Sequence, residues 1–372
     1  MIEVSEVTEL DKLRKYMILK KFSTKLSDNR TAALITCEQN IYYFTGFANS
    51  EGTLFVTREK SYLLVDFRYG EAARKSVTNC EVVVYEKYAD SLKELAKKHG
   101  IKEVLIEASK VTVSRCAVFQ KLFSEVECKV ISNDMLDKLI SNQRIIKSKD
   151  EIAKIEKAQR ITEEAYLELL NMVKPGVREA DLALELEFLM RKKGASGVSF
   201  DLITITGKKT SMPHGVPGDD VVKTGDFVTF DIGAVYEGYH SDMTRTIAVG
   251  EVSDYQREIY NIVLEAQLSG LAKVKAGTKA SDVDKAARDV ITNKGCGEYF
   301  KHSTGHGVGL DIHEQPFLAS RSDKILSDGM IITVEPGIYL PDKFGVRIED
   351  MVVVTKEGCR NLANLPKELT II

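Results

Sequence analysis

Apolar and polar residues form two successive patterns along this chain, and the change lies near residue 145. Before it, short apolar runs typical of buried strands alternate with segments in which apolar residues recur every three or four positions, as in amphipathic helices. The expected strands are 32–37, 53–57, 62–66, 81–85, 104–107 and 126–131, and the expected helices are 6–25, 91–99 and 114–123. Strands that alternate with helices predict an α/β domain with a mixed or parallel sheet and helices on its faces.

A helix start marks the beginning of the second pattern. Ser148 and Glu151 have the S-x-x-E spacing of a capping box. Apolar residues then recur at helical spacing from Ile152 to Ala165, so we expect a long amphipathic helix there. We therefore divide the chain into a first domain, 1–144, and a second domain, 145–372.

The second domain contains an internal repeat. VKPGVREADL at 173–182 matches VKAGTKASDV at 274–283, and TGDFVTFDIG at 224–233 matches SDGMIITVEPG at 327–337. The second match aligns Asp231 with Glu335, and Asp242 then corresponds to Glu349. Two duplicated halves that pack about a pseudo-twofold axis would bring both carboxylate pairs to one place.

These four carboxylates lie in unusually apolar surroundings. Asp231 and Glu335 follow apolar, β-branched runs, and Asp242 and Glu349 precede further runs. A short Gly-containing connection at 236–238 predicts a hairpin that joins the two aspartates. A carboxylate inside a buried strand is costly unless it is paired, protonated or bound to a metal. For any one of them, a solvated strand end or an ion pair is the alternative interpretation.

A histidine between two glycines, His306, completes a possible metal site. An oxygen-rich ligand set with one imidazole suits Mn²⁺, Co²⁺, Fe²⁺ or Zn²⁺. Solvated strand ends do not explain all five residues together, because four carboxylates in apolar strands would then lack any ligand. We therefore expect a cluster of divalent metal ions.

The motifs FDIGA, SDMTRT, STGHGVGL, VEPGIY and RIED occur in this order and resemble the signature of the "pita-bread" metallopeptidases. That family includes methionine aminopeptidase, Xaa-Pro aminopeptidase and Xaa-Pro dipeptidase (prolidase). The resemblance implies an α+β pita-bread catalytic domain with two divalent ions, Mn²⁺ first and Co²⁺, Zn²⁺ or Fe²⁺ as alternatives. It implies the metal ligands Asp231, Asp242, His306, Glu335 and Glu349, with Glu335 also serving as the proton shuttle.

Other polar residues near these motifs receive roles from the same resemblance. His214, His302 and His313 would contact the substrate and stabilise the tetrahedral intermediate, as N–H donors can. Arg347 resembles the family's arginine near the substrate, although an ion pair to a ligand carboxylate explains it equally well. His99 and His240 are expected at the surface.

The first domain limits which members of the family this chain resembles. NIYYFTGF at 40–47 and LVDFRY at 64–69 resemble the N-terminal domain shared by creatinase, prolidase and Xaa-Pro aminopeptidase, which methionine aminopeptidase lacks. Aromatic packing at a sheet edge is the alternative for Tyr42, Tyr43 and Phe44. The intact ligand set argues against creatinase and against the family's ligand-poor binding proteins.

The choice of substrate depends on few residues. Phe317 stands where some prolidases carry an arginine for the dipeptide carboxylate, which favours longer Xaa-Pro peptides. The compact spacing between Glu335 and Glu349 favours prolidase. We therefore expect an Xaa-Pro aminopeptidase, with Xaa-Pro dipeptidase as the alternative and a non-catalytic peptide-binding module as the alternative of another class.

The composition of the chain limits the kinds of partner and the compartment that we expect for this protein. The chain has 372 residues and a net charge of −3, which gives no sign of a nucleic-acid partner. No apolar run is long enough to span a membrane, and the first residues are too polar for a secretory signal. Six scattered cysteines without a CxxC pair predict reduced thiols in a cytoplasmic protein. The resemblance implies a homodimer in which Arg68 faces the partner's active site, or is simply a surface arginine.

Overall fold

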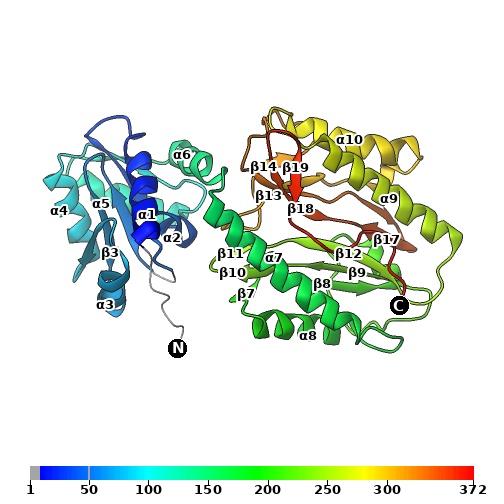
Figure 1. Cartoon of the computed structure of the whole chain (residues 1–372). Helices are drawn as coiled ribbons and strands as arrows, with labels where there is room; N and C mark the ends of the chain where they lie inside the picture. Colours follow the sequence, from blue (N-terminus) through cyan, green and yellow to red (C-terminus); the bar gives the residue numbers. More distant parts are fainter. Residues whose placement is uncertain (1–8, 49–50) are drawn as a thin grey trace. The chain divides into compact units, whose positions relative to one another are not determined.

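The computed structural model describes residues 9–48 and 51–372, in two compact units that divide between Gln143 and Arg144 (Figure 1). The first residues of the helix expected at 6–25 lie outside the described residues, and the described helix spans Glu9–Ser23. None of the described helices is long and apolar enough to cross a bilayer.

The first unit is built on one mixed sheet of six strands in the order β4-β3-β2-β1-β5-β6. Strand β1 pairs antiparallel with β2 and parallel with β5, and the outer pairs β3–β4 and β5–β6 are parallel. The strands are β1 Thr31–Ile35, β2 Thr53–Val56, β3 Ser61–Val65, β4 Glu81–Val84, β5 Glu103–Ile106 and β6 Lys129–Ile131. The helices are α1 Glu9–Ser23, α2 Glu38–Thr45, α3 Phe67–Ser76, α4 Tyr88–Lys98, α5 Val113–Ser124 and α6 Met135–Arg144.

The aromatic motif at 40–47 forms most of helix α2, which the strand and helix patterns did not predict. Phe44 is buried, and its ring centroid lies 4.7 Å from that of Phe22 in α1. Gly46 ends the helix with φ 77°, a left-handed C-cap that glycine adopts without strain. These aromatic residues therefore pack in the helix layer against α1.

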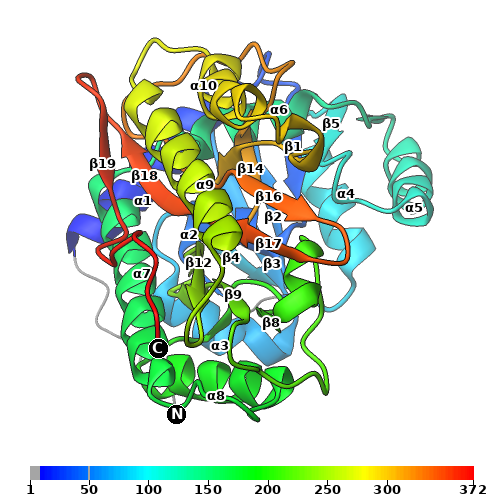
Figure 2. The same ribbon diagram turned by 90° about the vertical axis from the view of Figure 1, so that its right-hand side faces the viewer.

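The second unit consists of two similar halves. The first contains α7 Lys149–Leu170, α8 Glu179–Lys192, β7 Gly197–Val198, β8 Ile203–Thr206, the 3₁₀ helix η1 Gly207–Ser211, β9 Phe227–Ile232, β10 Ala234–Tyr236, β11 Tyr239–His240 and β12 Met243–Ala248. The second contains α9 Asp254–Lys273, α10 Ala280–Asn293, η2 Gly297–Tyr299, β13 Gly305–Gly307, β14 Glu314–Leu318, β15 Ile331–Val334, β16 Gly337–Leu340, β17 Phe344–Arg347, β18 Asp350–Val354 and β19 Cys359–Asn361. Figure 2 shows the helix pairs α7–α8 and α9–α10, with β16 and β17 beside α9.

Local backbone features recur in the two halves, as the sequence repeat predicted. Helices α7 and α9 each begin with a capping box, at Ser148 and Ser253. The two glycines that precede α8 and α10 have almost the same left-handed φ, 92° at Gly176 and 90° at Gly277. The first half buries one apolar cluster between α7, α8 and its strands, the second half buries another between α10 and its strands, and a third cluster contains residues of both halves. The duplication is therefore present in the structure as well as in the sequence.

Candidate functional site

The two aspartates come together through a hairpin, as expected. Strands β9 and β12 pair antiparallel with Ile232 opposite Met243, so Asp231 and Asp242 stand at one end of the same strand pair. Strands β10 and β11 make the connection, and Glu237 and Gly238 turn it with φ 47° and 77°. Positive φ at both central residues is typical of a tight hairpin turn.

The two glutamates occupy the matching places in the second half. Strands β15 and β18 pair antiparallel with Val334 opposite Asp350. Glu335 directly follows β15, and Glu349 directly precedes β18. Of the four carboxylates, Asp231 alone lies within a strand, so the expectation of four strand-borne carboxylates needs correction. The other three lie beside strand ends, where irregular backbone leaves the side chains free to converge.

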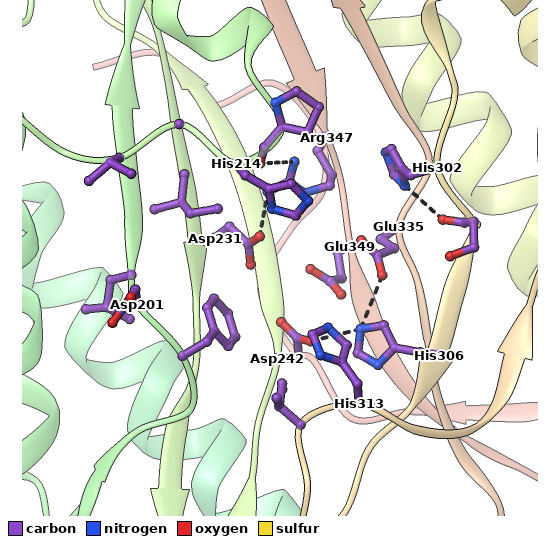
Figure 3. A pocket seen from close by; sticks show the side chains of 18 of the residues that line it. Asp201, His214, Asp231, Asp242, His302, His306, His313, Glu335, Arg347 and Glu349 are labelled. Carbon is purple, nitrogen blue, oxygen red and sulfur yellow. Dashed lines mark hydrogen bonds and ion pairs between the residues drawn. The ribbon is translucent and has the colours of Figure 1, made fainter. Parts of the chain in front are cut away.

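His306 lies in β13, and Gly307 beside it pairs with Ile332 of β15. The ligand atoms of Asp242, His306 and Glu349 all lie within 4.8 Å of one another (Figure 3). His306 Nε2 is 3.5 Å from Asp242 Oδ2 and 3.4 Å from Glu335 Oε1. Its Nδ1 lies 3.0 Å from the Gly307 carbonyl oxygen, which can only accept a hydrogen bond. Nδ1 therefore carries the proton, and the Nε2 lone pair faces the carboxylates.

Burial of like charges makes this cluster electrostatically unfavourable by itself. Burial raises the pKa of Asp242 well above its ordinary range, and the neighbouring Asp231 and Glu335 raise it further. Burial also raises the pKa of Glu335 to about 8 and that of Glu349 well above its usual range. Burial lowers the pKa of His306 to about 4, so this ring is neutral at neutral pH.

The residues present fit the binding of divalent cations. Asp231 Oδ1 is buried and has no hydrogen-bond partner among the described residues. A neutral imidazole with its Nε2 lone pair turned toward carboxylates is the form that binds metal, and the hydrogen bond from Nδ1 to a carbonyl fixes that orientation. A divalent ion would also compensate the repulsion that raises the carboxylate pKa values.

Arg347 forms the ion pair that the sequence left as one of two alternatives. Its Nη2 donates to Asp231 Oδ2 at 2.5 Å, and its Nη1 donates to the Tyr339 hydroxyl at 2.8 Å. The Tyr339 hydroxyl lies 3.0 Å from His302 Nε2, and His302 Nδ1 lies 2.8 Å from the Ser303 carbonyl. Both ring nitrogens of His302 are therefore engaged, and burial lowers its pKa to about 4.

A pocket of ≈ 740 Å³ opens onto this cluster. His214, His302, His313 and Arg347 all line it together with the five predicted ligands. His214 and His313 are exposed, and the His313 ring packs edge-on against His306 with centroids 4.4 Å apart. The structure thus gathers every predicted site residue in one place. Apolar side chains complete the wall, among them Phe200, Leu202, Ile203, Val216, Ile312 and Phe317.

Two polar residues that support the site were not singled out from the sequence. Tyr339 joins Arg347 to His302, and Thr244 donates to Glu349 Oε2 at 2.7 Å while it accepts from Arg347 Nε. Thr244 lies in the motif SDMTRT and Tyr339 in the motif VEPGIY, so both belong to segments that already indicated the site. Neither residue titrates near neutral pH, so neither was recognised as a candidate from its residue type.

The expectation that His99 and His240 lie at the surface holds only in part, because both are half-buried. His99 Nε2 lies 2.7 Å from the Tyr62 hydroxyl. His240 Nδ1 is buried without a hydrogen-bond partner in the described part of the chain, and burial lowers the pKa of this ring. Neither histidine lines the pocket.

Comparisons with known proteins agree with this arrangement. Residues 153–356 match the model of metallopeptidase family M24, and residues 18–146 match that of the creatinase/prolidase N-terminal domain. The Xaa-Pro dipeptidase of Pyrococcus horikoshii is 39% identical over 91% of this chain and 94% of its own length.

Solved structures show the same similarity. A structure described as Xaa-Pro dipeptidase from Bacillus anthracis superposes with a TM-score of 0.91 at 42% identity and covers 97% of this chain and 100% of its own. The X-Pro aminopeptidase from Thermotoga maritima has a TM-score of 0.87 at 36% identity, with 95% and 100% covered. These matches confirm the predicted combination of a creatinase-type N-terminal domain with a pita-bread catalytic domain.

Proposed function

Because this chain belongs to metallopeptidase family M24, we propose that it is an Xaa-Pro dipeptidase, which cleaves the bond between an N-terminal residue and a following proline. The observation that carries this proposal is the similarity, over nearly the full length of both chains, to proteins described as Xaa-Pro dipeptidases. It reverses the first choice made from the sequence, the aminopeptidase.

The Xaa-Pro aminopeptidase remains the second candidate for a specific reason. Phe317 lines the pocket and is 41% exposed, so an apolar side chain stands where an arginine would hold a dipeptide carboxylate. A peptide longer by one residue has no charge at that point. The similarity to the Thermotoga maritima aminopeptidase is in keeping with this alternative.

The divalent ions implied by the family would be held by Asp231, Asp242, His306, Glu335 and Glu349, with Mn²⁺ as the first choice and Co²⁺, Zn²⁺ or Fe²⁺ as alternatives. When bound, two such ions supply Lewis-acid activation of a water molecule and of the scissile carbonyl. Arg347 would hold the Asp231 carboxylate in place through its 2.5 Å contact.

Glu335 is placed to move a proton during hydrolysis. Its side chain is 17% exposed, compared with 6% for Asp242, so it is open to the pocket. Thr333 donates to its Oε1 at 3.1 Å and holds the carboxylate in place. In this proposal Glu335 takes the proton of the attacking water and passes it to the leaving proline nitrogen.

The histidines divide into two groups in this proposal. His313 is exposed above His306 and donates an N–H to the developing oxyanion, and exposed His214 binds the substrate across the pocket. The ring nitrogens of His302 are already used by Ser303 and Tyr339, so we assign His302 to the pocket wall and to the support of Arg347.

Proline selection follows from shape in this proposal. An Xaa-Pro bond is a tertiary amide without an N–H, and its ring is rigid. An apolar wall such as that of Phe200, Ile312 and Phe317 can contact the ring without offering an acceptor to the amide nitrogen.

Turnover of Ala-Pro and of Ala-Pro-Ala by the Mn²⁺-loaded protein tests the proposal. A dipeptidase cleaves Ala-Pro with the higher kcat/KM, and the reverse preference would identify an aminopeptidase. Equal cleavage of Ala-Ala-Ala would contradict proline specificity while leaving a metallopeptidase. Binding of either peptide without turnover would indicate the non-catalytic peptide-binding module.

A homodimer is part of the proposal and is supported by the family resemblance alone. Arg68 is 51% exposed and forms ion pairs with Asp66 and Glu51 of its own chain, as a surface arginine would. Sedimentation velocity at the assay concentration distinguishes a dimer from a monomer, and Arg68→Ala would impair turnover only where Arg68 reaches a partner's pocket.

A further inference from the structure

A group of four charged residues, two buried and two partly buried, lies beside the pocket and has no role in the proposed chemistry. It consists of Arg144, Lys147, Asp311 and Glu314, which we call the Arg144 cluster. Arg144 Nη2 is 2.8 Å from Asp311 Oδ2 and also contacts Glu314 Oε1, and Lys147 Nζ is 3.0 Å from Glu314 Oε2. The side chains of Lys147 and Glu314 are 1% and 9% exposed.

Glu314 is the centre of this cluster. Both of its oxygens contact a cation, and Oε1 also accepts from the Asp311 backbone N–H at 3.1 Å. Although burial opposes ionisation, Lys147 and Arg144 lower the pKa of Glu314 to about 2. The carboxylate is folded over Gly309, where an added Cβ would lie 2.6 Å from Glu314 Oε1. The loop that follows His306 is thus shaped around one carboxylate.

The neighbour of Glu314 in the chain is His313. Glu314 is the first residue of β14 and pairs with Gly307 of β13, directly after His306. Glu314 points into the Arg144 cluster, and His313 points into the pocket against the His306 ring (Figure 3). His313 is bonded directly to Glu314 in the chain, so the contacts that hold the Glu314 side chain also restrict the backbone beside His313.

We propose that Glu314, held by Arg144 and Lys147, is a positioning residue that aims the His313 imidazole at the reacting carbonyl. This inference rests on the proposed function, because it requires His313 to act on the substrate. Arg144 and Lys147 lie just before α7, more than 160 positions away in sequence from the loop that they hold. The start of the second unit thereby becomes part of the catalytic scaffold.

A kinetic double-mutant cycle tests the proposal. Glu314→Gln keeps the size of the side chain but removes the charge that binds both cations. In the metal-loaded protein with Ala-Pro as substrate, we expect kcat to fall roughly 10- to 100-fold with KM little changed, the range seen when a partner that orients a functional ligand is lost. In a His313→Ala background the same substitution should change kcat by no more than about twofold.

Two further variants keep the test decisive. Glu314→Gln leaves Lys147 buried with less compensation, and the double variant Glu314→Gln/Lys147→Met restores the balance because Arg144 still pairs with Asp311. It should show the same loss of kcat with wild-type metal content and a native circular dichroism spectrum. Glu163→Gln is the matched control, because Glu163 is a buried glutamate paired with Arg160 that does not line the pocket. It should leave kcat unchanged.

The outcomes separate this inference from the proposed function. An equal loss of kcat in the wild-type and His313→Ala backgrounds would show that Glu314 acts on the fold in general, and would overturn the positioning role. Full activity of both Glu314 variants would overturn it too. Wild-type kcat in His313→Ala would remove its premise, while wild-type protein that cleaves no Xaa-Pro peptide would refute the proposed function and this inference with it.

Discussion

Asp350→Asn should remove a large part of the stability of the second unit. Asp350 is fully buried directly after Glu349, and its Oδ1 accepts from Arg245 Nη2 at 2.8 Å. Its Oδ2 accepts from Gln267, Asn361 and Lys367 at 2.8 to 3.1 Å. Arg245 itself is buried and also donates to the Glu349 carbonyl at 2.6 Å. This network joins β12 of the first half to β18 of the second.

The size of the expected loss in unfolding free energy depends on the negative charge and the accepted hydrogen bonds of Asp350 that asparagine cannot supply. Four donors converge on Asp350, so an amide NH₂ in its place must face at least one of them. Lys367 is 16% exposed and can turn toward solvent, but Arg245 is 3% exposed and stays buried without its compensating charge. Removing one partner of a buried pair costs about 3–5 kcal/mol. The free energy of unfolding of a whole domain is only about 5–15 kcal/mol.

Urea unfolding measures the difference in the free energy of unfolding between Asp350→Asn and the wild type. The chain contains no tryptophan, so far-UV circular dichroism is the probe, with a chelator present to remove any contribution from bound ions. Asp289→Asn is the control, because the Lys285–Asp289 pair is 70% and 53% exposed and such pairs contribute about 0–1 kcal/mol. A loss below about 1 kcal/mol for Asp350→Asn, with an unchanged m value, would refute the reasoning.

Three further predictions concern the site. Asp242→Ala should lose most of the roughly two divalent ions expected per chain after reconstitution, as measured by elemental analysis, and a variant that keeps both ions would contradict the ligand assignment. His313→Ala should lower kcat by a factor on the order of 10² to 10³ with metal content unchanged, and full activity would exclude the oxyanion role. Because the pKa of Glu314 is held at about 2, its contribution to stability is present above the unfolded pKa of about 4.3 and is lost as pH falls toward 2. Between neutral pH and pH ~2, the free energy of unfolding of Glu314→Gln should therefore fall by roughly 3 kcal/mol less than that of the wild type, as measured by urea unfolding at each pH. Parallel curves of unfolding free energy against pH for the two proteins would contradict the assigned pKa.

The sequence could predict features that depend on neighbouring residues. The capping box at Ser148 needs only Glu151, three positions away, and the structure contains both of its hydrogen bonds. The tight turn at Glu237-Gly238 likewise depends on local backbone preferences. Helix α2 was missed because its eight residues are mostly polar or aromatic, and its burial against Phe22 of α1 is decided by a distant contact.

The sequence by itself determined which residues are candidates for the site of this protein. The order of the motifs identified all five candidate ligands, and the internal repeat related the two aspartates to the two glutamates, because the duplicated segments kept an acidic residue at each matching position. The tertiary structure alone decided how those groups are oriented and supported. Arg347 binds Asp231 across 116 positions, and Arg144 reaches Glu314 across 170. Such partners carry no periodicity in the sequence, since burial and hydrogen bonding between distant residues arise only when the two halves pack together.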